Sequence, residues 1–321
     1  MSTSRIVTFI ILTVLEFVYF FFAKKMEIVD VPNHRSSHSR LTVRGGGIIF
    51  PVSVIIWWIL FDFQHTWMVL GLVLIAGISF IDDLHSLSRK LRFGVQFLAI
   101  SFSFYDLDLF ANFPFYTWPV FFFIALGITN AVNFMDGING ITGVYGIIFF
   151  GSLMALNVSL EIFDENLIQY ILLSLFVFLL FNFRKSALMF AGDIGSISVA
   201  YLMIYFMGQW YLKTGSWTVV LILLIYGADV FLTMVERYRR GEKLTEPHRS
   251  HLYQLLVNQK KIPHILIAIL YGTLQLIVNA VLFFNAPAGL PDFYLAIGIL
   301  VGTAFVYLLI KNRIDREIAS K

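Results

Sequence analysis

The chain has 321 residues, of which 59% are hydrophobic and only 13% are charged, and its mean hydropathy is +0.81. Soluble domains carry about 25% charged residues, so this composition excludes a soluble globular domain and predicts a helical protein that crosses a membrane several times. The absence of cysteine excludes disulfides, thiol nucleophiles and cysteine-bound metals. The net charge of +3 is small, and we expect no nucleic-acid partner.

Eleven apolar stretches are expected to form transmembrane helices, because a helix of about 20 residues crosses roughly 30 Å of hydrocarbon. In chain order they cover residues 6–23, 46–61, 67–81, 91–105, 115–133, 139–158, 166–183, 194–210, 217–236, 263–284 and 290–310. The first lacks the charged leader and the small-residue cleavage site of a signal peptide, so we expect it to be retained. No extramembrane domain interrupts the series, which predicts a single integral membrane catalytic domain over residues 1–321.

The positive charges predict how the chain is oriented. All but two of its 23 lysine and arginine residues, Arg5 and Lys213, fall on loops that the eleven helices would place on one side of the membrane. Because cytoplasmic loops are enriched in these residues, that side is expected to be the cytoplasm. The N-terminus is then outside and the C-terminus is cytoplasmic.

Two adjacent carboxylates, Asp82 and Asp83, end the apolar stretch from Trp67 to Ile81. A charge well inside a bilayer costs about 2.5–3.5 kcal/mol, and neighbouring like charges repel unless a cation or a proton relieves them. Asp136 and Asp193 also stand beside apolar stretches. Carboxylates gathered at one membrane face suggest a divalent cation and a phosphorylated substrate.

Five polar segments share this expected cytoplasmic face: VDVPNHRSSHSRLTVRGGG (29–47), DDLHSLSRKLR (82–92), NAVNFMDGING (130–140), AGDIGS (191–196) and EPHRSHLYQ (246–254). Taken singly, most of them are also consistent with helix caps, turns or hinges. Five on one face, against polar-poor loops on the other, are not expected from capping alone. Phosphoryl transfer needs the groups that they supply: carboxylates for Mg²⁺, basic side chains for phosphate charge, and glycines that let the backbone approach phosphates.

The order and spacing of these motifs resemble the polyprenyl-phosphate N-acetylhexosamine-1-phosphate transferases. The resemblance rests on RGGG at 44–47, DD at 82–83, NAVNFMDGING at 130–140, GDIGS at 192–196 and the histidine segment at 248–251. HRSHLYQ is most similar to the branch that initiates O-antigen or capsule synthesis. The resemblance implies transfer of a sugar 1-phosphate from a UDP-N-acetylhexosamine to undecaprenyl (polyprenyl) phosphate, with release of UMP. It also implies a need for Mg²⁺, or Mn²⁺ in its place, and a site on the cytoplasmic face of the bacterial inner membrane. A homodimer is compatible with the resemblance.

The resemblance also implies roles for particular residues. Catalytic roles fall to Asp82, Asp83, Asp193 and His251, with Asp193 as the main metal ligand and Asp82 and Asp83 assisting it or holding the lipid phosphate. Substrate binding falls to Arg44, Lys90, Arg92, Asn133, Asp136, Gly137, Asn139, His248 and Arg249. In this set, 133–139 would surround the uridine, Lys90 and Arg92 would face phosphates, and His248, Arg249 and His251 would face the diphosphate or sugar. Many relatives carry further histidines where this chain has Leu252, Tyr253 and Gln254, so its sugar recognition is expected to differ.

Two other classes of protein compete with this hypothesis. A transporter or flippase would explain eleven spans and the intramembrane Asp229, but it needs its carboxylates near the midplane, whereas most of them lie at the cytoplasmic ends. A prenyltransferase or CDP-alcohol phosphotransferase repeats Asp at three- or four-residue intervals on a helix. Here Asp83 is followed by Leu84, His85, Ser86 and Leu87, so that pattern fails. The sequence leaves open which N-acetylhexosamine is the substrate.

Overall fold

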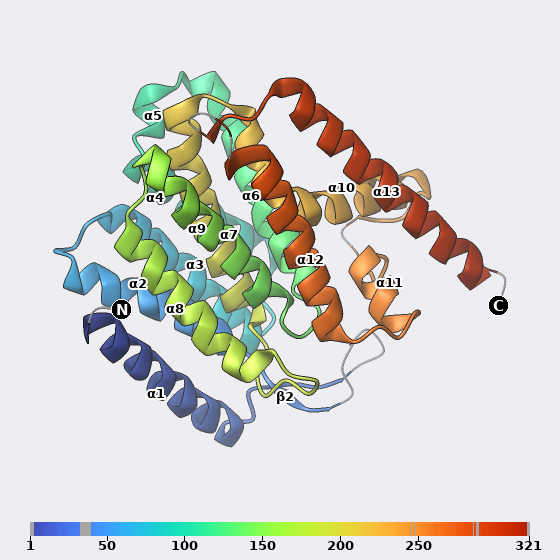
Figure 1. Cartoon of the computed structure of the whole chain (residues 1–321). Helices are drawn as coiled ribbons and strands as arrows, with labels where there is room; N and C mark the ends of the chain where they lie inside the picture. Colours follow the sequence, from blue (N-terminus) through green and yellow to red (C-terminus); the bar gives the residue numbers. More distant parts are fainter. Residues whose placement is uncertain are drawn as a thin grey trace.

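The protein is a bundle of long helices joined by short loops, described here from a computed structural model (Figure 1). The structure describes residues 3–32, 40–244, 246, 248–284, 286 and 289–319. Its α-helices are α1 (Thr3–Lys25), α2 (Ile49–Leu60), α3 (Thr66–Leu84), α4 (Arg89–Asp106), α5 (Leu109–Asn112), α6 (Trp118–Met135), α7 (Ile141–Leu160), α8 (Glu165–Asn182), α9 (Gly192–Thr214), α10 (Leu224–Arg239), α11 (Leu252–Asn258), α12 (His264–Asn279) and α13 (Phe293–Ala319). Short 3₁₀ turns η1 (Gly46–Ile48), η2 (Phe115–Thr117) and η3 (Trp217–Leu223) lead into α2, α6 and α10, and a π-helical turn η4 (Ala280–Phe284) extends α12.

All eleven apolar stretches of the sequence are helical, which confirms the expected all-α membrane fold. Within the described residues, eight helices are long and apolar enough to cross a membrane, and the segment Gly46–Leu60 is apolar but shorter. The two remaining stretches lie in α4, which begins with basic residues, and in α9, whose polar side chains are buried within the bundle. The count of eleven spans and the orientation of the termini stay predictions.

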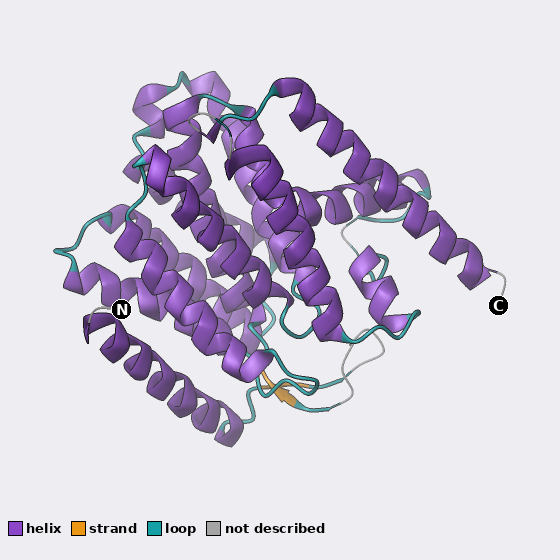
Figure 2. Ribbon diagram, viewed as in Figure 1, coloured by secondary structure: helices purple, strands orange, loops and turns teal. Residues whose placement is uncertain are grey.

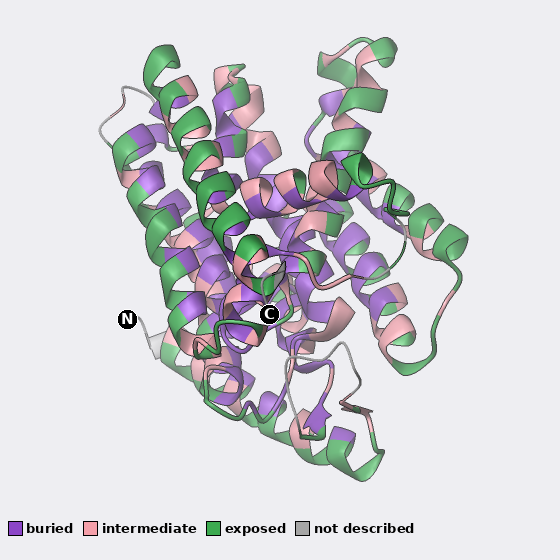
Figure 3. Ribbon diagram, turned by 90° about the vertical axis from the view of Figure 1, so that its right-hand side faces the viewer, coloured by how far each residue is buried: buried purple, intermediate pink, exposed green. Residues whose placement is uncertain are grey.

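Helix α9 forms the centre of the bundle. It packs against α2, α3, α4, α6 and α7, and nearly every residue from Ile194 to Met207 is buried. Figure 3 shows buried residues gathered between the helices, while the outward faces of the helices are exposed. Those outward faces carry large apolar side chains such as Phe123 and Phe231, as expected of helices that face lipid. The polar side chains of α9, including Ser196 and Ser198, are therefore kept inside the protein.

A short β-hairpin sets the position of the first polar segment. Strands β1 (Val29–Asp30) and β2 (Thr42–Val43) pair antiparallel and are the strands seen among the loops in Figure 2. Residues 33–39 of this segment lie outside the described residues. Val43 also forms a parallel bridge with Met189, just before α9. This bridge aligns the RGGG segment at 44–47 with the start of α9.

The last helix, α13, lies on the outside of the bundle and contacts mainly α10 (Figure 1). Most of its length is exposed and apolar, which suits a helix in contact with lipid. Its C-terminal part carries charged side chains that pair with neighbouring elements. Lys311 contacts Glu236 of α10 at 2.7 Å, and Glu317 pairs with Lys260 after α11. These ion pairs hold the end of α13 beside the segment that contains the histidines.

Candidate active site

The second aspartate of the adjacent pair, Asp83, is buried and fully engaged. Its side chain has no exposed surface, and its Oδ1 lies 2.7 Å from Nε of Arg44. The backbone N–H groups of Asp193 and Ile194 donate to its two oxygens at 3.0 and 3.1 Å. Asp83 thus caps the first turn of α9, and its charge is compensated by Arg44.

The first aspartate, Asp82, points to a different partner. Its Oδ2 lies 2.7 Å from Nη1 of Arg92 in α4, and its Oδ1 accepts the backbone N–H of Leu87 at 2.7 Å. The carboxylate of Asp193 lies between the two arginines, 3.6 Å from Arg44 and 3.6 Å from Arg92. The carboxylates of Asp82 and Asp193 both lie beside Nη1 of Arg92, which brings them close to each other. The structure therefore brings together three predicted aspartates and two predicted arginines.

A contact between two carboxylates is unfavourable unless a proton or a cation lies between them. Within the described parts of the chain, no three His, Asp or Glu side chains are arranged as a complete metal site. Mg²⁺ usually takes only one or two protein carboxylates and completes its shell with substrate phosphates and water. The side chains of Asp82 and Asp193 are 10% and 18% exposed and fit that requirement, whereas the side chain of Asp83 has no exposed surface.

Close backbone contacts explain the glycines of two motifs. A Cβ on Gly47 would lie 2.1 Å from Cα of Gly195, so the RGGG segment and the GDIGS turn touch without side chains between them. Gly192 has φ +72°, and a Cβ there would lie 2.5 Å from Oδ2 of Asp83. The hydroxyl of Tyr19 in α1 donates to the carbonyl of Arg44 at 2.7 Å. These contacts fix the backbone of Arg44 beside Asp83.

Asp136 lies directly after α6, where the motif NAVNFMDGING turns into α7. It accepts a hydrogen bond from the hydroxyl of Thr142. Burial, with a smaller contribution from the charges of Asp193 and Asp83, raises the pKa of Asp136 to about 7, although the Thr142 hydroxyl opposes the rise. The carboxyl group is therefore protonated in part of the molecules at neutral pH.

The neighbours of Asp136 in its motif mostly support the loops. Asn133 accepts a hydrogen bond from Ser196 of α9 at 2.8 Å. The side-chain amide of Asn139 donates to the carbonyl of Arg184 at 2.8 Å and so ties two predicted cytoplasmic loops together. A Cβ on Gly137 would lie 2.2 Å from the hydroxyl of Tyr253, so the glycine is needed for close packing.

The two histidines of the last motif lie next to each other, with ring centroids 4.7 Å apart. Nδ1 of His248 is 2.9 Å from the hydroxyl of Ser250, and Nδ1 of His251 is 3.3 Å from Asp229. Burial, together with the nearby charge of Arg237, lowers the pKa of His248 to about 4, so its ring is neutral at pH 7. Nε2 of His251 is buried and has no hydrogen-bond partner among the described residues.

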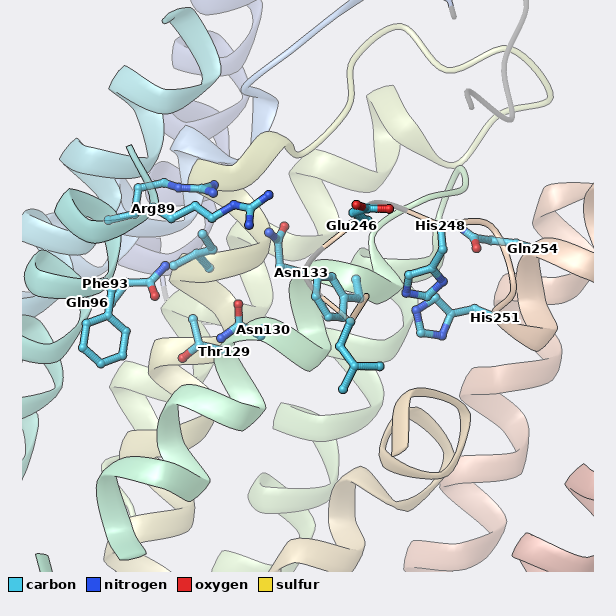
Figure 4. Close-up of a pocket in the computed structure, with 14 residues that line it drawn as sticks. Arg89, Phe93, Gln96, Thr129, Asn130, Asn133, Glu246, His248, His251 and Gln254 are labelled. Atoms are coloured by element: carbon cyan, nitrogen blue, oxygen red, sulfur yellow. The ribbon is translucent and has the colours of Figure 1, made fainter. Parts of the chain in front are cut away.

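A cavity of about 570 Å³ opens between α4, α6 and the segment that carries the histidines. Figure 4 shows Arg89 on one wall, the rings of His248 and His251 on the opposite wall, and Asn133 between them. The cavity is lined by Arg89, Arg92, Phe93, Gln96, Thr129, Asn130, Asn133, Phe134, Ile197, Leu244, Glu246, His248, His251 and Gln254. Arg92 belongs both to this lining and to the aspartate cluster, so the cavity and the carboxylates form one site.

Some predicted site residues lie apart from this cavity. Lys90 is exposed and does not line it, because α4 turns by about 100° per residue and presents Arg89 and Arg92, three positions apart, on the same face. Arg249 is half-buried and is not among the lining residues either. The substrate-binding roles that the sequence predicts for Lys90 and Arg249 are not tested by this arrangement, in which Arg89 and Arg92 take the place on α4 that was expected of Lys90.

Several lining residues were not predicted from the sequence: Arg89, Gln96, Thr129, Asn130 and Gln254. Gln96 and Asn130 stand inside or next to expected membrane spans, where polar side chains are costly unless they face a cavity or a partner. That signal was present in the sequence. Gln254 stands in the segment HRSHLYQ, where its difference from the relatives was the signal, and its Oε1 is buried at the cavity without a partner among the described residues.

Comparisons with known proteins find similar proteins over most of the chain. Residues 65–211 match the model of glycosyl transferase family 4, a range that includes Asp82, Asp83, Asp136 and Asp193. A probable undecaprenyl-phosphate N-acetylglucosaminyl 1-phosphate transferase of Bacillus subtilis (strain 168) is 25% identical over 73% of this chain and 71% of its own length. An undecaprenyl-phosphate alpha-N-acetylglucosaminyl 1-phosphate transferase of Escherichia coli (strain K12) is 26% identical over 80% of this chain and 76% of its own length.

A relative whose name contains a different sugar is also similar to this chain. The phospho-N-acetylmuramoyl-pentapeptide-transferase of Streptococcus pneumoniae (strain 70585) is 27% identical over 73% of this chain and 80% of its own length. The reaction named for these relatives is the same kind of transfer, while the sugar in their names varies. The O-antigen branch that HRSHLYQ suggested is not specified by these matches and stays a prediction. The matched range and these relatives support the family that the motifs resemble, the polyprenyl-phosphate N-acetylhexosamine-1-phosphate transferases, and the chain is a multi-pass membrane transferase.

Proposed function

We propose that the protein transfers an N-acetylhexosamine 1-phosphate from a UDP-sugar to undecaprenyl phosphate. An oxygen of the lipid phosphate forms a bond to the sugar-linked phosphorus, the bond from that phosphorus to the bridging oxygen breaks, and UMP leaves with this oxygen. The observation that carries the proposal is the cluster of Asp82, Asp83 and Asp193 with Arg44 and Arg92, beside a cavity lined by two histidines. The names of the bacterial relatives support the acceptor.

The basic side chains would hold the phosphates of the two substrates. Arg92 can exchange part of its contact with Asp82 for a phosphate, because its guanidinium lies at the boundary between the carboxylates and the cavity. Arg89 lines the same wall and adds positive charge. A phosphate monoester has its second pKa near 6, so the lipid phosphate is mostly a dianion at pH 7 and needs orientation more than deprotonation.

Asp193 and Asp82 would hold Mg²⁺, with Mn²⁺ as a substitute, through their facing oxygens. When bound, the cation neutralises phosphate charge that develops during the transfer. Asp83 would act instead as a positioning residue, because its side chain has no exposed surface and holds both Arg44 and the first turn of α9. This division separates the roles of two carboxylates that the sequence presents as an equivalent pair.

Asp136 would bind the uridine, with Asn133 and Gly137 beside it. Its ionised form accepts hydrogen bonds from donors such as a ribose hydroxyl or the uracil N–H. Asn139 would act through the loop that it holds at Arg184. His248 and His251 lie on the opposite wall of the cavity, where they would face the diphosphate or the sugar.

We further propose that the site faces the cytoplasm of a bacterial inner membrane, with the N-terminus outside and residues 1–321 acting as one domain. The charge distribution supports this orientation, because the eleven expected spans would place all but two of the 23 lysine and arginine residues on the side of the aspartates. The product would be the first lipid-linked sugar of a cell-surface polysaccharide such as an O-antigen. The resemblance allows this enzyme to act as a homodimer.

A UMP-release assay tests this proposal. Purified protein in detergent with undecaprenyl phosphate and Mg²⁺ is given a panel of UDP-N-acetylhexosamines, and at least one is expected to yield UMP in step with a new lipid product. EDTA is expected to stop the release, and Asp193→Ala is expected to abolish it. Uptake of a substrate into vesicles without any UMP would instead support a transporter.

A further inference from the structure

Asp229 is a buried carboxylate in α10, and no role in the transfer reaction follows from the motifs. Its side chain is 1% exposed, and helices α11, α12 and α13 all contribute donors to it. The carboxylate receives two backbone N–H groups and two tyrosine hydroxyls: Leu252 (2.9 Å), Tyr253 (3.2 Å), Tyr271 (2.7 Å) and Tyr307 (3.1 Å). A buried charge is costly, and these four donors offset that cost by stabilising the ionised form of the carboxylate.

The same carboxylate also contacts His251. Oδ1 of Asp229 lies 3.3 Å from Nδ1 of the ring. Since an ionised carboxylate can only accept hydrogen bonds, the ring nitrogen that faces it carries the proton. Nε2 is then the ring atom available to a ligand, and it is buried with no partner within the part of the chain that the structure describes.

The direction of this free atom matters, because His251 lines the cavity (Figure 4). The backbone contacts of Asp229 to Leu252 and Tyr253 hold the chain on the C-terminal side of the histidine, while its contact to Nδ1 holds the ring. A carboxylate that only capped α11 would not need the contact to the ring. Beside the contact to Nδ1, the unpartnered Nε2 is a second, independent observation. It indicates that the ring is oriented to bind a ligand in the cavity.

We propose that Asp229 is a positioning residue for the transfer reaction, which fixes the ring of His251 with Nδ1 protonated and Nε2 turned toward the substrate in the cavity. This inference rests on the proposed function, because the substrate is taken to be the diphosphate or sugar of the nucleotide sugar. It also removes the support that Asp229 lends to the transporter hypothesis, since its oxygens are occupied by the donors described above.

A double-mutant cycle tests the inference in the full-length protein. Asp229→Asn is expected to lower kcat about 10- to 100-fold with a smaller change in KM, as is typical when a group that orients a histidine is removed. In a His251→Ala background the same substitution is expected to change kcat less than about twofold. A loss that is equally large in both backgrounds overturns the proposal, because the effect is then structural.

Asp106→Asn is the matched control for these measurements. Asp106 also accepts hydrogen bonds from a tyrosine and a backbone N–H and contacts a histidine, through Tyr205, Met68 and His65. It lies at the opposite end of α4 from Arg89 and Arg92 and does not line the cavity. Its amide variant is expected to lose stability and to keep kcat within about twofold; if it lowers kcat as much as Asp229→Asn does, the proposal is overturned.

The ring nitrogens give a readout that needs neither turnover nor a folded variant of Asp229. In wild-type protein with ¹⁵N-labelled histidine, the His251 signals, identified by their absence in His251→Ala, are expected to show a protonated Nδ1. An unprotonated Nδ1 overturns the inference, whatever the activity. If no UDP-sugar supports turnover but Nδ1 is protonated, the proposed function fails while the arrangement of the two residues stands.

Discussion

The carboxylate of Asp83 accepts the backbone N–H of Asp193 at 3.0 Å, although the two residues lie 110 positions apart. Two of the three aspartates proposed for the chemistry are thus joined by one hydrogen bond that fixes where the side chain of Asp193 begins. The same carboxylate holds Arg44 at 2.7 Å. This relationship separates a supporting aspartate from the two that face each other in the open part of the site.

Asp82 and Asp83 are therefore expected to respond differently to the same substitution. Asp83→Asn removes a buried charge that pairs with Arg44, and breaking such a pair costs about 3–5 kcal/mol, so the melting temperature in detergent should fall clearly. Asp82→Asn is expected to lower kcat about 100-fold, by loss of charge that positions the cation and phosphates, with a smaller fall in melting temperature because Asp82 is more exposed than Asp83. Equal losses of stability in both variants would contradict this division and show that the two carboxylates have the same structural role.

Arg92 and Lys90 offer a comparison on one helix. Arg92 contacts Asp82 and lines the cavity, whereas Lys90 is exposed away from it. We expect Arg92→Ala to reduce kcat/KM about 100-fold or more, and Lys90→Ala to change it less than about threefold, since surface charges that touch nothing contribute little. Steady-state kinetics with both substrates varied measures this. A large loss in Lys90→Ala would mean that the substrate contacts a different face of α4.

Asp136 should make stability depend on pH. Its folded-state pKa is raised from 3.8 to about 7, so the protonated form is favoured on folding. The stability that this group contributes is complete below about pH 4 and is lost as the pH rises to about 7. Asp136→Asn keeps an acceptor for Thr142 but has no charge, so its melting temperature relative to wild type should rise between pH 5 and pH 7 and then level off. A difference that is constant with pH would rule out the raised pKa.

The close contact between two motifs predicts the effect of adding one methyl group. Gly47→Ala would place a Cβ 2.1 Å from Cα of Gly195, and overpacking of this kind costs about 1–3 kcal/mol. The variant should therefore melt at a lower temperature and lose most of its activity, because Arg44 moves with the loop. Gly77→Ala in α3 is the control, since a Cβ there meets nothing within 4 Å and alanine favours the helix. Similar behaviour of the two variants would contradict the proposed packing.

Much of the fold could be predicted from the sequence, because length and hydropathy decide which stretches become membrane helices. The central helix α9 was predicted although it carries serines, glycines and tyrosines, because its apolar stretch is long enough to form a helix that spans the bundle. The exact number of membrane crossings cannot be derived in the same way. Helices such as α4 begin with several basic residues, so composition alone does not say how deep they lie.

The motifs identified most residues of the site, but their different tasks depend on packing. Because Asp82 and Asp83 are identical and adjacent, the sequence does not predict which of the two side chains caps α9. Choosing Arg89 and Arg92 over Lys90 requires the exact helical register, which Ser88 sets by capping α4 through the backbone N–H of Leu91. The contacts of Asp229 come from α11, α12 and α13 together, and no local sequence pattern predicts that these three helices pack around one carboxylate.

The most direct test of the central claim follows the sugar-linked phosphorus. The protein, reconstituted in vesicles with undecaprenyl phosphate and Mg²⁺, is given the UDP-N-acetylhexosamine that releases UMP, labelled with ³²P at the phosphate next to the sugar. The account predicts that the label moves into the lipid phase in equal amount to the UMP formed, and that Asp193→Ala and Asp82→Ala abolish this movement. Label that stays in the water phase as UDP while sugar enters the lipid would contradict the account, because the enzyme would then transfer the sugar without its phosphate.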